Sequence, residues 1–169
     1  LLGCSDLNQL KPFGIAHYTF DNKPLMVSRT GFTGDLGYEV WVPPETAEIL
    51  WDQLFEIGKD YLIKPIGGHA LDLARIEAGF LQAHVDFVPV EEAVRPGRSR
   101  SPFELGLEWL VDFSKPLFNG RSALLAEKTN GSKFRFALLD IDGNKPAHNS
   151  FILKGEKQVG TVTSAAWGP

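Results

Sequence analysis

Alternating apolar and polar residues mark the beginning of the chain. Residues 14–20 and 25–29 alternate and are rich in aromatic and β-branched types, and the turn-forming sequence DNKP at 21–24 separates them. This pattern predicts a β-hairpin. Residues 38–42 alternate again and stop at two prolines, so we expect a third strand there.

The apolar spacing then changes to three and four residues, which is typical of helices. Residues 45–61 carry apolar side chains at this spacing and predict an amphipathic helix. A second helix is expected over 69–79, where Asp72 and Arg75 are spaced to form an ion pair and Gly79 ends the helix. Strands followed by helices predict an α/β region.

The second half is less regular. Residues 84–102 contain several prolines and glycines and predict a long loop. A short helix is expected over 120–128, capped by Asn119. Strand-like runs follow, and they suggest a domain boundary near residue 130. The expected strands lie at 134–141, 151–154 and 158–164.

Composition places the 169-residue chain among globular proteins, since 43% of it is hydrophobic and 22% charged. The net charge of −4 argues against nucleic-acid or anionic-membrane partners. No apolar run is long enough to span a bilayer, so no membrane partner is expected. The single cysteine, Cys4, excludes an internal disulfide and favours a reducing, cytoplasmic setting.

The segment at 28–40, SRTGFTGDLGYEV, concentrates the candidate chemistry. Its glycines recur at every third position, unlike the dinucleotide or phosphate-binding patterns, and a structural turn is the simplest interpretation. The segment ends in Glu39, which shares a strand face with Trp41. A carboxylate beside an aromatic ring suits a flat heterocycle with paired N–H donors, because it can accept two hydrogen bonds side by side. Pterins, purines and guanidino groups all qualify.

Other polar groups have simpler interpretations. Asp72, Arg75 and Glu77 fit a solvated ion-pair face on one short helix. The loop arginines fit a solvated loop, with a phosphate, a polyanionic tail or RNA as alternative ligands; they are Arg95, Arg98 and Arg100. The four histidines show no metal-binding spacing, so no metal site is predicted; they are His17, His69, His84 and His148. Cys4 lies near a terminus and is a poor candidate nucleophile.

Five stretches, in order, resemble the aminomethyltransferase family, which includes the T-protein of the glycine cleavage system. The segment at 28–40 is similar to the family signature, and DLARIEAG at 72–79 to its arginine-bearing helix. The later stretches are PFELGLEW at 102–109, FNGRSAL at 118–124 and VGTVTS at 159–164. Together they extend over nearly the whole chain.

This resemblance implies an α+β protein. It would consist of a folate-binding α/β domain over 1–130, with antiparallel strands and packed helices, and an incomplete C-terminal β-barrel over 131–169. Open barrel edges would favour self-association.

The implied activity is a tetrahydrofolate-dependent aminomethyl or methyl transfer. The donor would be a small amine, thioether or sulfonium compound, free or bound to a carrier protein. The family likeness implies that Glu39 holds the pterin, that Trp109 lies in the folate site, and that Thr33 and Arg75 contribute to it.

Three departures from the family pattern shape these expectations. The family's catalytic aspartate lies upstream of the matching signature, so the chain is expected to be a fragment that is inactive alone. Leu71 stands where glycine-cleavage enzymes carry a folate-contacting arginine, and residues 95–102 lengthen a family loop. The alternatives are the folate domain of a dimethylglycine or sarcosine dehydrogenase-type protein, or a folate-binding module without transfer activity. Such a module would resemble the tRNA-modification and iron–sulfur-assembly relatives, with the loop arginines contacting RNA or a partner.

Overall fold

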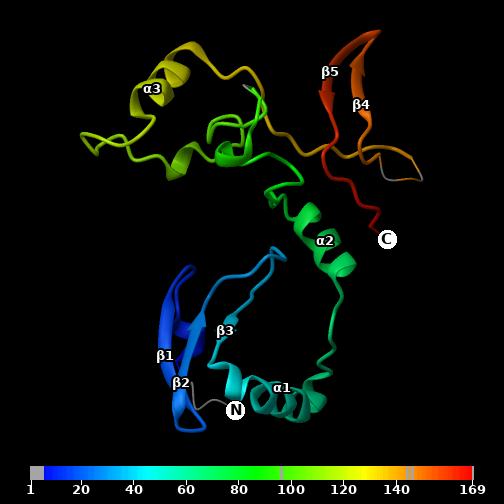
Figure 1. Ribbon diagram of the computed structural model, residues 1–169. Coiled ribbons are helices and arrows are strands. Elements are labelled where there is room, and N and C mark those ends of the chain that lie inside the picture. Colours follow the sequence, from blue (N-terminus) through cyan, green and yellow to red (C-terminus); the bar gives the residue numbers. More distant parts are fainter. Residues whose placement is uncertain (1–5, 96, 144, 146, 169) are drawn as a thin grey trace. The chain divides into compact units, whose positions relative to one another are not determined.

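The computed structural model describes residues 6–95, 97–143, 145 and 147–168 (Figure 1). The chain divides into two compact units, Leu1–Phe80 and Leu81–Pro169, and both contain helices and strands. Cys4 lies outside the described residues. The domain boundary expected near residue 130 stays a prediction.

A three-stranded antiparallel sheet forms the first part of unit 1 (Figure 1). Strands β1 (Ile15–Phe20) and β2 (Lys23–Ser28) form the predicted hairpin, and β3 (Glu39–Trp41) pairs with the other edge of β2. Asp21 and Asn22 have φ values of 49° and 58°, as a tight two-residue hairpin loop requires. The turn is therefore shorter than predicted, and β2 begins at Lys23 rather than at 25.

Two α-helices follow the sheet, as the apolar spacing predicts. Helix α1 (Pro44–Gly58) continues into a short 3₁₀ helix, η2 (Lys59–Tyr61), and α2 (Gly68–Glu77) comes after a connection. The side chain of Ile63 folds back onto the end of α1, since a Cβ placed on Gly58 would lie 2.3 Å from its Cγ2. A further 3₁₀ helix, η1 (Leu7–Gln9), precedes β1.

The end of α2 has the geometry of a glycine-terminated helix. Gly79 adopts a φ of 75°, the Phe80 N–H donates to the Arg75 carbonyl at 2.8 Å, and the Gly79 N–H donates to the Ile76 carbonyl at 3.0 Å. These two bonds define a Schellman motif and satisfy carbonyls that the helix end leaves free. The prediction that Gly79 ends the helix is confirmed.

The core of unit 1 lies between the hairpin and α1. Its buried apolar side chains share one face of the sheet with one stripe of the helix; they are Phe20, Leu25, Val27 and Leu50. In the register of β2 and β3, Val27 is opposite Val40, whereas Ser28 is opposite Glu39. Because side chains alternate between the faces of a sheet, Glu39 projects from the face opposite the core.

Unit 2 contains short elements joined by long loops. They are η3 (Val90–Glu92), η4 (Glu108–Leu110), α3 (Arg121–Asn130), β4 (Phe151–Lys154) and β5 (Lys157–Thr161). The two strands form an antiparallel hairpin, which confirms the expected strand at 151–154 and most of the one at 158–164.

Two expectations for unit 2 are wrong. Residues 134–141 do not form a strand; the Phe136 N–H donates instead to the Glu104 carbonyl at 2.7 Å. Helix α3 is preceded by Gly120 at a φ of 85°, with no side-chain cap, so Asn119 is not its N-cap. No closed barrel is present among the described residues, and the incomplete barrel and its self-association stay predictions.

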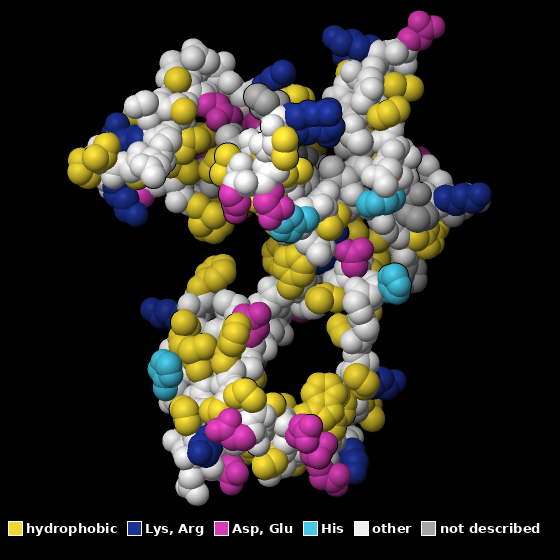
Figure 2. All heavy atoms as spheres, viewed as in Figure 1, with side chains coloured by type: hydrophobic (Ala, Val, Ile, Leu, Met, Phe, Trp, Pro, Cys, Tyr) yellow, Lys and Arg dark blue, Asp and Glu magenta, His cyan; other side chains and the backbone are white. Residues whose placement is uncertain are grey.

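Large apolar side chains remain exposed on both units (Figure 2). The exposed fraction is 56% for Trp51 in unit 1, and 69% for Trp109 and 86% for Leu117 in unit 2. Within the described ranges, every helix is too short or too polar to cross a membrane.

Candidate functional site

The candidate site of unit 1 is built on Glu39, at the first position of β3. The Thr30 hydroxyl donates a hydrogen bond to Glu39 Oε2, and the Ser28 hydroxyl lies 3.4 Å from the same oxygen. Ser28 and Thr30 Oγ atoms are 2.7 Å apart. Ser28 is 6% exposed, whereas Glu39 is exposed. The carboxylate therefore lies at the surface, above the buried hydroxyl of Ser28.

The number of hydroxyl hydrogens limits how Ser28, Thr30 and Glu39 can be hydrogen-bonded. Each hydroxyl carries a single hydrogen, so Ser28 and Thr30 cannot both donate to Glu39 and also bond to each other. The distances favour a relay in which Ser28 donates to Thr30 and Thr30 donates to Glu39 Oε2. Within the described part of the chain, no group donates to Oε1. That oxygen and the remaining lone pair of Oε2 are open to a ligand.

Glycines bring Thr30 and Glu39 together from opposite ends of the connecting segment. A Cβ on Gly31 would lie 3.6 Å from the Cα of Gly37, so the two ends of the segment run close to each other. Gly34, between them, has a φ of 84° and approaches Ala78, the residue directly after α2: a Cβ on Gly34 would lie 2.5 Å from the Cβ of Ala78. A side chain at this position would both strain the backbone and collide with Ala78.

The other residues expected in the folate site have different surroundings. Thr33 is half-buried in the glycine-rich segment. Trp109 lies in η4 of unit 2 with 69% of its surface exposed, and its pairing with Glu39 stays a prediction. Leu71, at the position of the family arginine, is 37% exposed.

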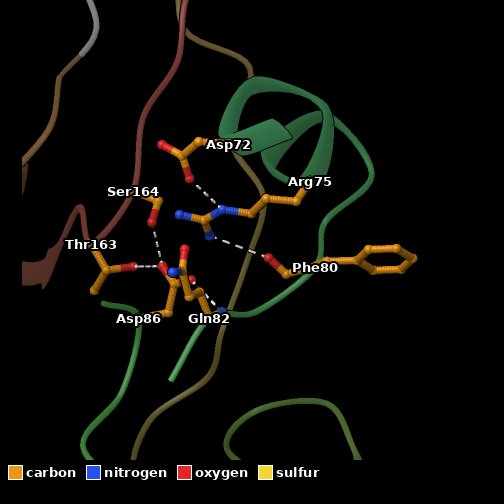
Figure 3. A network of polar contacts seen from close by, with 7 residues as sticks. All are labelled: Asp72, Arg75, Phe80, Gln82, Asp86, Thr163 and Ser164. Carbon is orange, nitrogen blue, oxygen red and sulfur yellow. Dashed lines mark hydrogen bonds and ion pairs between the residues drawn. The ribbon is translucent and has the colours of Figure 1, made fainter. Parts of the chain in front are cut away.

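Arg75 is buried, which corrects the expectation of a solvated ion-pair face. Its side chain is 3% exposed, and Nε donates to Asp72 Oδ1 at 2.7 Å, so the predicted ion pair does form. Nη1 donates to the Phe80 carbonyl at 3.3 Å (Figure 3). These two partners belong to α2 and the turn that follows it, and a direct contact of Arg75 with folate stays a prediction.

Unit 2 contains a hydrogen-bonded cluster around one carboxylate, Asp86, that was not predicted from the sequence. Asp86 Oδ1 accepts hydrogen bonds from the hydroxyls of Thr163 and Ser164 at 2.6 and 2.7 Å, and Oδ2 accepts from the Gln82 N–H at 2.9 Å (Figure 3). The only hint of this cluster in the sequence is the pair of adjacent hydroxyl residues, Thr163 and Ser164, at the end of the VGTVTS stretch. Their partner is more than seventy residues away, so spacing alone could not identify it.

The three loop arginines are not equivalent. Arg100 donates to the carbonyls of Gly97 and Ser99 at 2.9 and 3.0 Å, and its guanidinium lies 4.2 Å from the centre of the Phe134 ring. Arg100 therefore braces the loop. Arg95 and Arg98 are exposed, as expected of a solvated loop. Among the described residues, no three His, Cys, Asp or Glu side chains are grouped as a metal site requires.

Comparison with known proteins shows the family of the chain. The profile of the GCVT N-terminal domain matches residues 4–115, which include the glycine-rich segment, helix α2 and Trp109. The chain belongs to this family. Its similarity to curated relatives extends beyond the matched domain, into the C-terminal strands.

The aminomethyltransferase of Pseudothermotoga lettingae is 33% identical over 98% of this chain and 43% of its own length. That of Caldanaerobacter subterraneus is 35% identical over 97% of the chain and 42% of its own length. The trimethylamine-oxide aldolase of Ruegeria pomeroyi is 39% identical over 86% of the chain but only 18% of its own length. The chain thus spans less than half the length of these curated relatives.

Proposed function

We propose that this chain is the folate-binding part of a tetrahydrofolate-dependent one-carbon transferase. The observation that carries the proposal is the surface carboxylate of Glu39, held through one oxygen by the relay from Ser28 and Thr30. Membership of the GCVT N-terminal domain family and similarity to proteins named aminomethyltransferase support the same conclusion.

The chemistry of the carboxylate matches that of a pterin. A pterin presents adjacent N–H donors on one edge of a flat ring, and an ionised carboxylate can accept both. Because Thr30 binds only Oε2, Oε1 stays open, and the relay fixes the orientation of the carboxylate before the ligand arrives. Such preorganisation lowers the entropic cost of binding.

The proposed reaction transfers one carbon to a folate nitrogen. A bond forms between that nitrogen and the donor carbon, while the bond from this carbon to an amine, thioether or sulfonium group breaks. The leaving group keeps the bonding electron pair, and the proton displaced from the folate nitrogen passes to the leaving group or to water. The folate-binding part would accelerate the reaction mainly by holding the acceptor nitrogen close to the donor carbon.

A second candidate concerns the donor. The Ruegeria pomeroyi relative is named for trimethylamine oxide, and its identity of 39% over 86% of the chain compares with 33% and 35% for the two aminomethyltransferases over nearly the whole chain. Leu71 replaces the arginine expected of glycine-cleavage enzymes. Both observations favour an N-methylated amine or amine oxide over an aminomethyl thioether.

Incubating the full-length protein with tetrahydrofolate and each donor class tests the proposal. We expect a one-carbon-substituted folate, detected by liquid chromatography and mass spectrometry, with one donor class and only when tetrahydrofolate is present. Folate binding without product from any donor class would instead support a binding module without transfer activity. Absence of both binding and product would contradict the proposal.

A further inference from the structure

The buried guanidinium of Arg75 joins two parts of the chain at the end of α2. Its Nε binds Asp72 inside the helix at 2.7 Å, and its Nη1 binds the carbonyl of Phe80 beyond the helix at 3.3 Å. A buried cation is tolerated only where hydrogen-bonding partners surround it. The planar fork of Arg75 therefore restrains the position of Phe80 relative to the helix.

The restrained turn is also the surface on which the glycine-rich segment packs. The Phe80 ring points away from the guanidinium (Figure 3) and stacks on the Phe32 ring, with centroids 5.7 Å apart and an interplanar angle of 23°. Two residues before Phe80, Ala78 lies against Gly34 and leaves no room for a Cβ there. Phe32 and Gly34 lie in the segment whose two ends carry Thr30 and Glu39.

We propose that Arg75 is a positioning residue for the carboxylate of Glu39. It fixes the turn after α2, the turn fixes the glycine-rich segment through Phe80 and Ala78, and the segment holds Thr30 against Glu39. This inference rests on the proposed folate site. It gives Arg75 a role through the protein rather than by contact with the ligand.

Two substitutions at Arg75 test the first link. Arg75→Ala removes the hydrogen bonds to Asp72 and Phe80, whereas Arg75→Lys keeps the charge but lacks the fork that reaches these two residues together. In the full-length protein, we expect Arg75→Ala to weaken tetrahydrofolate binding at least tenfold and Arg75→Lys to have an intermediate effect. The amide NMR signals of residues 30–39 should shift in the ligand-free Arg75→Ala protein. Leu54→Ala, a substitution on α1 next to the core, is the control for general destabilisation and should leave affinity and these signals nearly unchanged.

The contact between Gly34 and Ala78 gives a test that does not depend on Arg75. Gly34→Ala should displace the segment and weaken binding at least tenfold, because the added Cβ meets Ala78. Ala78→Gly alone should weaken binding less than Gly34→Ala does, because it removes a contact without adding a clash. The double variant should recover most of the loss, although the positive φ at position 34 leaves some strain.

The outcomes separate this inference from the folate site itself. Wild-type affinity and unshifted signals in Arg75→Ala, or a double variant that binds no better than Gly34→Ala, would overturn the positioning role. If Glu39→Gln also binds with wild-type affinity, the proposed folate site at Glu39 is wrong as well. If Glu39→Gln alone weakens binding, the site stands and only the role of Arg75 is lost.

Discussion

The carboxylates of Glu39 and Asp112 each accept a hydrogen bond from a hydroxyl group within ten residues along the chain. Thr30 donates to Glu39 across the glycine-rich segment, and Ser114 donates to Asp112 from two residues away. The second arrangement is local: the Ser114 hydroxyl and backbone N–H reach Asp112 Oδ1 at 2.6 and 2.9 Å. The same chemistry thus stabilises an ionised carboxylate in a turn and orients another at the candidate site.

The pKa of Asp112 offers a direct test of the local arrangement. The Ser114 hydroxyl, then its N–H, and to a smaller degree Lys115 lower the pKa of Asp112 below its ordinary value of 3.8. Because the pKa is lowered in the folded state, the stabilisation is present above the ordinary pKa of 3.8 and is lost as the pH falls through the folded-state pKa. In an NMR titration, Ser114→Ala should raise the pKa of Asp112 towards 3.8. Ser122→Ala, an exposed serine of α3, is the control, and an equal effect of both variants would contradict the assignment.

Among the elements, a single helical turn at 101–107 forms hydrogen bonds to two later parts of unit 2, at Glu127 and Phe136. The Glu104 N–H donates to Ser101 Oγ at 3.1 Å, and the Ser101 N–H donates to Glu104 Oε2 at 3.2 Å, which is the reciprocal pattern of a capping box. The turn closes with the Leu107 N–H on the Pro102 carbonyl at 2.7 Å, and Gly106 has a φ of 72°. The SPFE sequence was the signal for this box, but no long helix follows it.

Removing the cap should therefore destabilise unit 2. Ser101→Ala leaves the Glu104 N–H without its acceptor and should lower the free energy of unfolding by about 1 kcal/mol, in the usual range for a lost N-cap. Ser132→Ala is the matched control, because Ser101 and Ser132 both donate to Glu127 Oε1 at 2.6 Å. Denaturant unfolding of the two variants compares them, and equal losses would show that the capping box contributes little.

Elements with local causes were predictable from the sequence. The β1–β2 hairpin follows from alternation around a turn, and α2 ends at Gly79 because the chain needs a left-handed residue there. The segment at 134–141 is also rich in apolar residues but is not a strand. Its Phe136 N–H donates to the Glu104 carbonyl instead of to a neighbouring strand. Strand formation depends on a partner distant in sequence, and periodicity does not identify that partner.

The candidate site was predictable in part for the same reason. Glu39 stands out because it is a carboxylate at the end of a glycine-rich segment and shares a strand face with Trp41. The relay through Ser28 and Thr30 depends on how that segment folds back, and the burial of Arg75 depends on the chain beyond α2. An ion pair at i, i+3 has the same spacing whether the helix face is solvated or buried.

At the scale of the whole molecule, the chain forms two units and spans less than half the length of its curated relatives. Unit 1 contains Glu39 and the elements that support it, and unit 2 contains Trp109, the arginine loop and the Asp86 cluster. We therefore propose that Glu39 of unit 1 recognises the ligand and that the reaction requires the complete protein.

Calorimetric titration of tetrahydrofolate into the full-length protein and its Glu39→Gln variant tests this assignment most directly. We expect Glu39→Gln to weaken binding by roughly 1.5–3 kcal/mol, or about 10-fold to 150-fold, the range for a hydrogen bond to a charged group. Glu48→Gln, an exposed glutamate of α1, should bind like the wild type. Equal affinity of the wild-type and Glu39→Gln proteins would show that Glu39 does not hold the pterin.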